Sequence, residues 1–122
     1  MRLVTAIPFA LLSLIPPALA DGPSFDCDKA AAPAEHLICA DSELVRLDGL
    51  MGETYNARRT SLPDAQRKAL LDQQRDWLKT RLTRCGIPTQ GGEPNEQQHW
   101  AWASCLADRS RERRAGRGVN EP

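Results

Sequence analysis

The chain has 122 residues, and its 16 Lys and Arg residues balance 16 Asp and Glu residues, so its formal net charge is zero. A neutral chain whose basic residues are not interleaved with aromatic ones lacks the charge pattern of a nucleic-acid-binding protein. The length is sufficient for one domain with a modest hydrophobic core.

The first twenty residues have the pattern of a cleavable export signal. Arg2 gives a positive start, residues 3–15 form an apolar stretch, and Ala18-Leu19-Ala20 is a small-residue cleavage sequence. The apolar stretch is too short to span a bilayer comfortably, and no second one follows. No cysteine directly follows the cleavage sequence, which argues against a lipid anchor. We therefore expect a mature chain that starts near Asp21, is periplasmic or secreted, and has no membrane anchor.

All cysteines lie in the part of the chain that follows this signal, where disulfides persist after export. They are Cys27, Cys39, Cys85 and Cys105. Three pairings are possible, and we favour the two that close local loops, joining the first cysteine to the second and the third to the fourth. Each would contribute about 3 kcal/mol in the chain-entropy model. A metal site is the alternative, and it is disfavoured because there is no Cys-x-x-Cys motif and only His36 and His99 remain as further ligands. We expect no metal and no cofactor.

The first two predicted helices follow in chain order. Pro33 suits the first turn of a short helix that runs to about Cys39. Asp41 is a good N-cap for the second helix. A core-facing stripe on this second helix contains Leu44, Leu47, Asp48, Met51, Tyr55 and Arg58. Gly49 and Gly52 each weaken the helix by about 1 kcal/mol relative to Ala, so tertiary packing must hold it.

The third predicted helix starts at Leu62-Pro63-Asp64 and runs to about Arg84. One of its faces carries a mixed set of large apolar and polar side chains. They are Leu70, Gln74, Trp77, Arg81 and Cys85. A buried amide and a buried guanidinium must find hydrogen-bond partners. This face therefore makes specific demands on whatever packs against it.

The fourth predicted helix begins near Pro94 or Glu96, after an exposed loop over residues 91–95. One of its sides carries Trp102, Cys105, Leu106 and Arg109. Its apolar content vanishes beyond Leu106, and we expect a flexible tail over residues 116–122. The chain has no internal repeat and no credible strand. We predict one all-α domain over residues 21–115, a small antiparallel helical bundle or hairpin of about four helices stapled by two disulfides. The sequence does not determine its oligomeric state.

The mature chain resembles the N-terminal domain of the LprI-type lysozyme inhibitors from about residue 24 to residue 113. The residues that carry the resemblance are Ser24-Phe25-Asp26-Cys27, Glu35-His36-Leu37-Ile38-Cys39, Leu44…Leu47-Asp48…Tyr55, Gln74-x-x-Trp77-Leu78-x-x-Arg81-x-x-x-Cys85 and Cys105-Leu106. The resemblance implies an exported helical protein that binds and occludes a lysozyme or a related wall hydrolase. Three departures are the missing lipid-attachment cysteine, the glycines at 49 and 52, and the sparse apolar residues after Leu106.

The polar face of the third helix has two interpretations. In the functional one, Arg81 and Gln74 line a groove that grips a carboxylate or a peptide, with Trp77 as its floor. In the structural one, which we favour, Arg81 pairs with Asp48 because a buried carboxylate needs a partner. Gln74 then bonds to backbone, while Trp77 and Tyr55 fill the core.

Catalysis has little support, because the cysteines are expected to be oxidised and no nucleophile has an identifiable base. We therefore expect a binding protein rather than an enzyme. Lysozymes are often cationic, so an acidic N-terminal segment is a candidate contact surface. The candidate contacts are Asp26, Asp28, Glu35, Asp41, Glu43 and Trp100. For Trp100 the alternative is that it covers the second disulfide. The alternative function is a non-inhibitory periplasmic module that binds another envelope protein or a wall fragment.

Overall fold

The computed structural model describes residues 22–115, and in this range the chain forms four α-helices and one short 3₁₀ helix, without any strand. The elements are η1 (Cys27–Lys29), α1 (Pro33–Ala40), α2 (Ser42–Ser61), α3 (Asp64–Cys85) and α4 (Glu96–Arg114). The predicted all-α fold class is confirmed. The predicted export signal over residues 1–20 and the predicted tail over residues 116–122 lie outside the described part of the chain.

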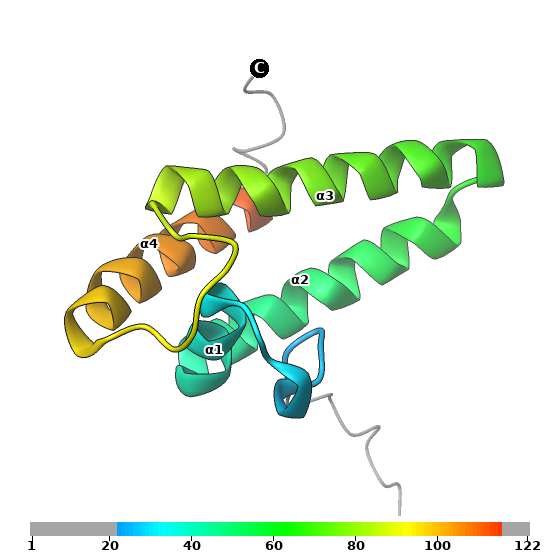
Figure 1. Ribbon diagram of the computed structural model, residues 1–122. Coiled ribbons are helices and arrows are strands. Elements are labelled where there is room, and N and C mark those ends of the chain that lie inside the picture. The colour runs from blue at the N-terminus through cyan, green and yellow to red at the C-terminus, as the bar shows by residue number, and fades with distance from the viewer. Residues whose placement is uncertain (1–21, 116–122) are drawn as a thin grey trace, which may run out of the picture.

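The helices are arranged around α4. Figure 1 shows α2 and α3 leaving the short turn at Leu62-Pro63 and diverging, with α1 at the open end and α4 behind them. α4 packs against α1, α2 and α3. The two arms of the predicted hairpin are therefore held together through α4, which at 19 residues is nearly as long as α2 with 20.

The inner face of α4 packs against the other helices although its sequence contains few large apolar residues. Its buried residues are mostly small: Ala103, Leu106, Ala107 and Ser110. Small side chains let two helices approach closely, so they contribute to packing without raising the apolar content. The sparse apolar residues after Leu106 consequently do not prevent the last helix from packing.

The hydrophobic core lies at the end of the molecule where α1 meets α2 and α4. Leu37, Leu47 and Leu106, one from each of these helices, have the largest fully buried side chains. Ile87 joins them from the loop after α3 and is 4% exposed. Gly86 makes this entry possible because it ends α3 in the left-handed conformation, with φ at 67°. The Ile87 N–H then donates to the carbonyl of Leu82 at 3.0 Å, which closes the helix end.

The disulfides pair as predicted. Cys27 bonds to Cys39 and Cys85 bonds to Cys105, with Cα–Cα distances of 5.8 and 5.7 Å. The first ties η1 to the end of α1, and the second ties the end of α3 to the middle of α4. Each closes a short loop, which restricts the unfolded chain.

The glycines of α2 make room for the N-terminal segment. A Cβ built on Gly49 would lie 2.6 Å from the carbonyl oxygen of Gly22, and one built on Gly52 would lie 2.8 Å from the Cβ of Ser24. The two glycines are three residues apart and so share one face of the helix. They therefore let the backbone of the N-terminal segment lie directly on α2.

Gly49→Ala is expected to lower the free energy of unfolding, although Ala is the better helix former by about 1 kcal/mol. The added methyl would collide with backbone, and overpacking of this kind costs about 1–3 kcal/mol. Urea unfolding measures the change. Gly92→Ala is the matched control because nothing lies within 4 Å of a Cβ at that position. A Gly49→Ala protein at least as stable as wild type would show that this close approach is absent in solution.

Candidate functional site

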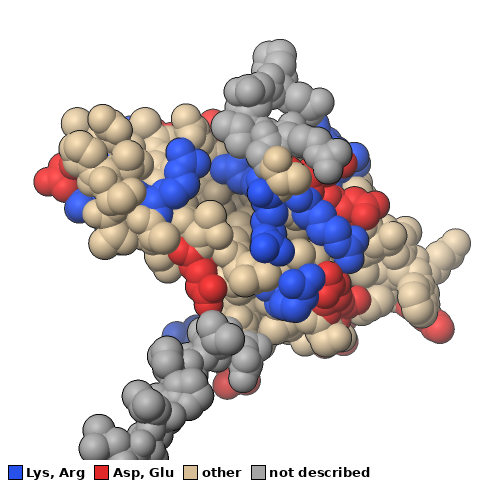
Figure 2. Space-filling model, turned by 180° about the vertical axis from the view of Figure 1, so that it is seen from behind, with Lys and Arg blue, Asp and Glu red and all other residues tan. Residues whose placement is uncertain are grey.

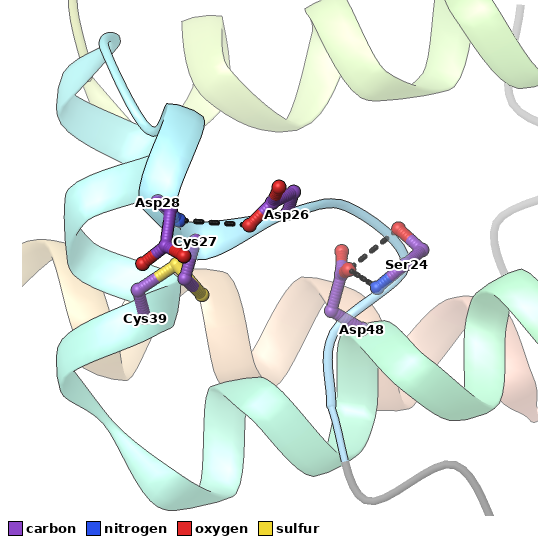
Figure 3. The surroundings of a disulfide bond; sticks show 6 residues. All are labelled: Ser24, Asp26, Cys27, Asp28, Cys39 and Asp48. Carbon is purple, nitrogen blue, oxygen red and sulfur yellow. Dashed lines mark hydrogen bonds between the residues drawn. A yellow bond between two sulfur atoms is a disulfide. The ribbon is translucent and has the colours of Figure 1, made fainter.

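A buried carboxylate lies at the point where the N-terminal segment, α2 and α3 meet. Asp48 Oδ2 accepts hydrogen bonds from the Ser24 N–H at 2.8 Å and from the Ser24 hydroxyl at 2.6 Å (Figure 3). Asp48 Oδ1 lies 3.9 Å from Nη2 of Arg81, and both side chains are almost fully buried. The ion pair between Arg81 and Asp48 expected from the sequence is thus present. Ser24 was not predicted as a partner, because nothing local marks an extended residue as the donor to a distant helix.

Arg81 is less fully satisfied than its partner. Within residues 22–115 its Nε has no hydrogen-bond partner. Its Cζ lies 5.1 Å from the centroid of the Trp77 ring, a cation–π contact. Burial lowers the pKa of Arg81, and the charge of Asp48 opposes this shift. Arginine nevertheless remains charged at physiological pH. The buried positive charge therefore depends on one long ion pair and one aromatic ring.

A cavity of about 550 Å³ opens beside this ion pair, between α2 and α3 on one side and the N-terminal segment and α1 on the other. Its wall is mainly apolar, with Phe25, Ile38 and Met51 among the lining residues, and Arg81 and Gln74 also line it. The groove of the functional interpretation is therefore present alongside the ion pair of the structural one. Trp77 is not among its lining residues, so this ring does not form the floor that the functional interpretation requires.

The polar face of α3 turns toward α4 more than the sequence predicted. Gln74 Oε1 accepts a hydrogen bond from Nη2 of Arg113 at 3.2 Å, so the expectation that Gln74 bonds to backbone is wrong. The guanidinium of Arg113 also lies over the Trp77 ring, with its Cζ 4.9 Å from the ring centroid. Trp77 and Tyr55 are only half-buried and do not belong to the core cluster. The reason is that the core forms around α1, while arginines of α4 reach the opposite end of the seam.

Asp48→Asn is expected to destabilise the protein more than Arg81→Met. Without the aspartate, the buried guanidinium loses its only counter-charge in the described part of the chain, and breaking a buried pair in this way costs about 3–5 kcal/mol. Without the arginine, Asp48 keeps both hydrogen bonds from Ser24. Chemical denaturation of the two variants measures the difference, which we expect to be roughly 1 kcal/mol or more. Equal losses would contradict the asymmetry.

Most of the acidic residues that were predicted to contact a partner accept a hydrogen bond from a backbone N–H group at the start of a helix. Asp26 accepts from the Asp28 N–H at 3.0 Å (Figure 3). Asp41 accepts from two N–H groups of the first turn of α2, each at 3.0 Å. Glu35 accepts from the Ala32 N–H at 3.1 Å, so α1 has a side-chain cap although its N-cap residue is alanine. Such caps satisfy backbone donors at helix ends. Asp28 is exposed, whereas the carboxylates of Asp26, Glu35 and Asp41 are hydrogen-bonded to the backbone.

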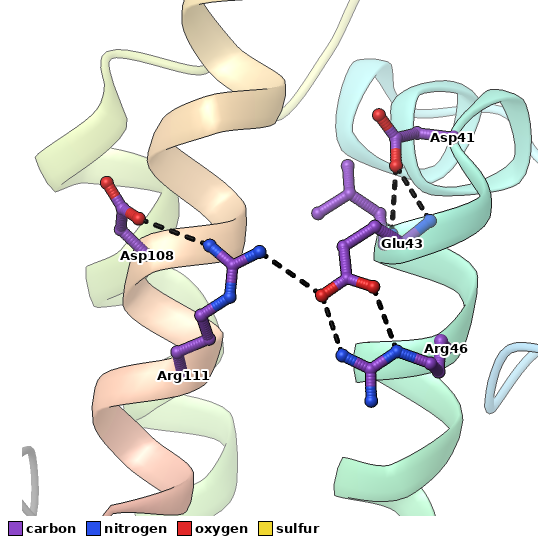
Figure 4. A network of polar contacts seen from close by, with 6 residues as sticks. Asp41, Glu43, Arg46, Asp108 and Arg111 are labelled. Carbon is purple, nitrogen blue, oxygen red and sulfur yellow. Dashed lines mark hydrogen bonds and ion pairs between the residues drawn. The ribbon is translucent and has the colours of Figure 1, made fainter.

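Glu43 links α2 to α4 through two arginines (Figure 4). Its carboxylate accepts from Nε and Nη2 of Arg46 at 2.8 and 2.6 Å, and from Nη2 of Arg111 at 3.1 Å. Arg111 also contacts Asp108 at 3.4 Å. The hydrogen bond from Arg46 is the largest cause that lowers the pKa of Glu43 from 4.5 to about 2. Much of the local negative charge is therefore neutralised within the protein.

Glu43→Gln is expected to reduce the loss of stability in acid. Because the pKa of Glu43 falls from 4.5 to about 2 on folding, its stabilisation is fully present above pH 4.5 and is lost as the pH falls through 2. Urea unfolding at several pH values between about 6 and 2 measures this slope. Glu53→Gln is the matched control, since Glu53 is exposed on the same helix and has no ion pair among the described residues. Identical pH slopes for the two variants would exclude the network as the cause.

Trp100 is the large apolar side chain that the described fold leaves in solvent. It is 73% exposed, on the second turn of α4, and it lines an open hollow with Asn95, Glu96 and Gln97. Trp102 instead packs against the core cluster. Trp100 therefore does not cover the second disulfide, and of the two alternatives its surface position is the one observed.

The comparisons with known proteins identify the family. The family model of the lysozyme inhibitor LprI matches residues 27–115. The chain belongs to the LprI lysozyme inhibitor family. The match runs from η1 to the end of α4 and includes both disulfides, Asp48 and Arg81. No curated protein and no solved structure matches the chain.

Membership in the LprI family places the chain in a group named for inhibition rather than for catalysis. The two disulfides and the family together indicate an extracytoplasmic protein. None of the described helices is long and apolar enough to cross a membrane. Between residues 22 and 115, no group of three or more His, Cys, Asp or Glu side chains is placed to hold a metal ion.

Proposed function

We propose that this LprI-family protein binds and occludes a lysozyme or a related wall hydrolase outside the cytoplasm. The observation that carries the proposal is the family match, which spans nearly all of the described fold. The physical properties of the fold support it. Two disulfides and a buried ion pair hold the helices in place before any partner arrives, so little ordering entropy is lost on binding.

The contact surface in this proposal is the end of the molecule formed by residues 88–95 and the first two turns of α4. Trp100 stands there in solvent, and tryptophan is among the residues that most often dominate binding energy. Glu96 lines the same hollow as Trp100, and Glu93 lies in the loop before it; both are exposed and form no ion pair within residues 22–115. Negative charges of this kind complement a cationic lysozyme.

The loop that leads to Trp100 has fixed ends. Ile87 is buried in the core at its start, and the Asn95 side chain caps α4 at its end, accepting from the Gln98 N–H at 2.9 Å. Cys105 ties the same helix to α3. This surface therefore combines an exposed anchor with a rigid base. Asp26, Glu35 and Asp41 contribute to the electrostatic field, while their carboxylates remain bound to helix starts.

The mature protein, in molar excess at low salt, is expected to slow the lysis of cells by lysozyme. Trp100→Ala is expected to raise the concentration needed for half-inhibition by about thirtyfold, the effect of a binding hot spot of about 2 kcal/mol. Gln73→Ala, an exposed substitution on α3, is the matched control and should leave inhibition unchanged. Added salt should weaken inhibition if the charges near Trp100 take part.

The outcomes separate the activity from the surface. Lysis that proceeds at the same rate with several lysozyme types would reject the inhibitory function. Inhibition that survives Trp100→Ala unchanged would reject this contact surface while keeping the function. Arg81→Met should not alter inhibition by the molecules that remain folded, because its side chain is buried away from this end.

One observation favours a second function, that of a non-inhibitory binding module of the cell envelope. The cavity of about 550 Å³ between α2 and α3 is large enough for part of a peptide or a wall fragment. Co-purification of a partner other than lysozyme, lost on Met51→Trp, would support this function. Met51 lines the cavity, so the larger side chain would fill it.

A further inference from the structure

A second and smaller cavity lies where α2, α3 and α4 meet, with a volume of about 260 Å³. Its lining is strongly basic and contains hydroxyl groups from two helices. The charged and hydroxyl-bearing residues are Thr54, Tyr55, Arg58, Ser110, Arg113 and Arg114. Among residues 22–115, no acidic side chain belongs to the lining. We call this site the arginine pocket. Figure 2 views the molecule from the α4 side and shows Lys and Arg side chains gathered across this face.

Arg113 is positioned without an acidic partner. Gln74 accepts its hydrogen bond at 3.2 Å, and Trp77 supports its guanidinium at 4.9 Å from the ring centroid. The other arginines that are at least partly buried all have a carboxylate in reach. Their pairs are Arg67–Asp64, Arg81–Asp48 and Arg109–Glu112. Among residues 22–115, Arg113 therefore stands apart as a half-buried cation held in place by neutral groups.

The positive charge in the arginine pocket is consequently not compensated by the described chain. Arg58 and Arg114 likewise form no ion pair with any described residue, although both line the cavity. Burial and the nearby charge of Arg58 both lower the pKa of Arg113. Like charges brought together at a partly buried site raise the free energy of the empty site. An anion bound between them would remove this cost.

We propose that the arginine pocket binds the phosphate group of a phosphate monoester or diester. A phosphate offers tetrahedrally arranged oxygens as acceptors, and the pocket is lined by arginines from two helices and by the hydroxyl groups of Tyr55 and Ser110. A flat carboxylate would engage fewer of these donors. The cavity volume suits a phosphate with a small substituent, and the source is either a free phosphate ester or the headgroup of an anionic lipid.

This site is independent of the proposed lysozyme contact. Arg113 lies thirteen residues after Trp100 on the same helix, which corresponds to about 20 Å along its axis. An anion could therefore occupy the arginine pocket while a protein partner covers the other end of α4. The loss of one activity would not imply the loss of the other.

The test is a calorimetric titration of the full mature protein with glycerol phosphate and with inorganic phosphate at low salt. Saturable binding is expected, and Arg113→Gln should weaken it by about tenfold or more. Arg75→Gln is the matched control, because it removes the same charge from an exposed position on α3 that does not line the pocket. Arg58→Gln should also weaken binding, and since Arg58 is exposed this variant retains the fold.

Vesicles distinguish the two sources of phosphate. Binding to phosphatidylglycerol vesicles but not to phosphatidylcholine vesicles, lost on Arg113→Gln, would assign the site to a lipid headgroup. Binding of glycerol phosphate without vesicle binding would assign it to a soluble ester. The proposal is overturned if neither the soluble phosphates nor the phosphatidylglycerol vesicles show saturable binding, if acetate binds as tightly as phosphate, or if Arg75→Gln weakens binding as much as Arg113→Gln.

Discussion

The buried carboxylate of Asp48 is the interaction on which the arrangement of this protein depends. It accepts two hydrogen bonds from Ser24 and carries the counter-charge of Arg81, so a single side chain joins the N-terminal segment, α2 and α3. α2 and α3 diverge from their turn, and a buried charge between them is tolerated only with partners on both sides. The glycines at positions 49 and 52 belong to the same constraint, because they let Ser24 approach close enough to donate.

α4 connects the other three α-helices to one another. It packs against all three other α-helices, is tied to α3 by Cys105, and meets α2 through Glu43 and Arg111. Its middle is committed to packing, and its two ends are chemically different. Trp100 is exposed near the first end, and three arginines surround a pocket at the last. A rigid helix with dissimilar ends can present two separate binding surfaces without any conformational change.

The acidic residues of the N-terminal segment are less available to a partner than their number suggests. Its negative charge, taken from the sequence, favours a surface for a cationic partner. In the fold, three of its carboxylates begin helices, one lies buried, and Glu43 is neutralised by two arginines. Charges that satisfy backbone donors still contribute to long-range steering, but they are less free to rearrange around a partner. Within residues 22–115, the exposed carboxylates of Glu93 and Glu96 form no ion pair of this kind.

Features that depend on local spacing could be predicted from the sequence. The helices and the cap at Asp41 were predicted from periodicity and turn residues, and the disulfide pairs and the Asp48–Arg81 pair were the favoured alternatives. Which helix covers the polar face of α3 could not be predicted, and the fold places Gln74 and Trp77 against Arg113 of α4. Periodicity shows which face of a helix turns inward but not which partner covers it, since that choice depends on how small residues far along the chain let helices approach.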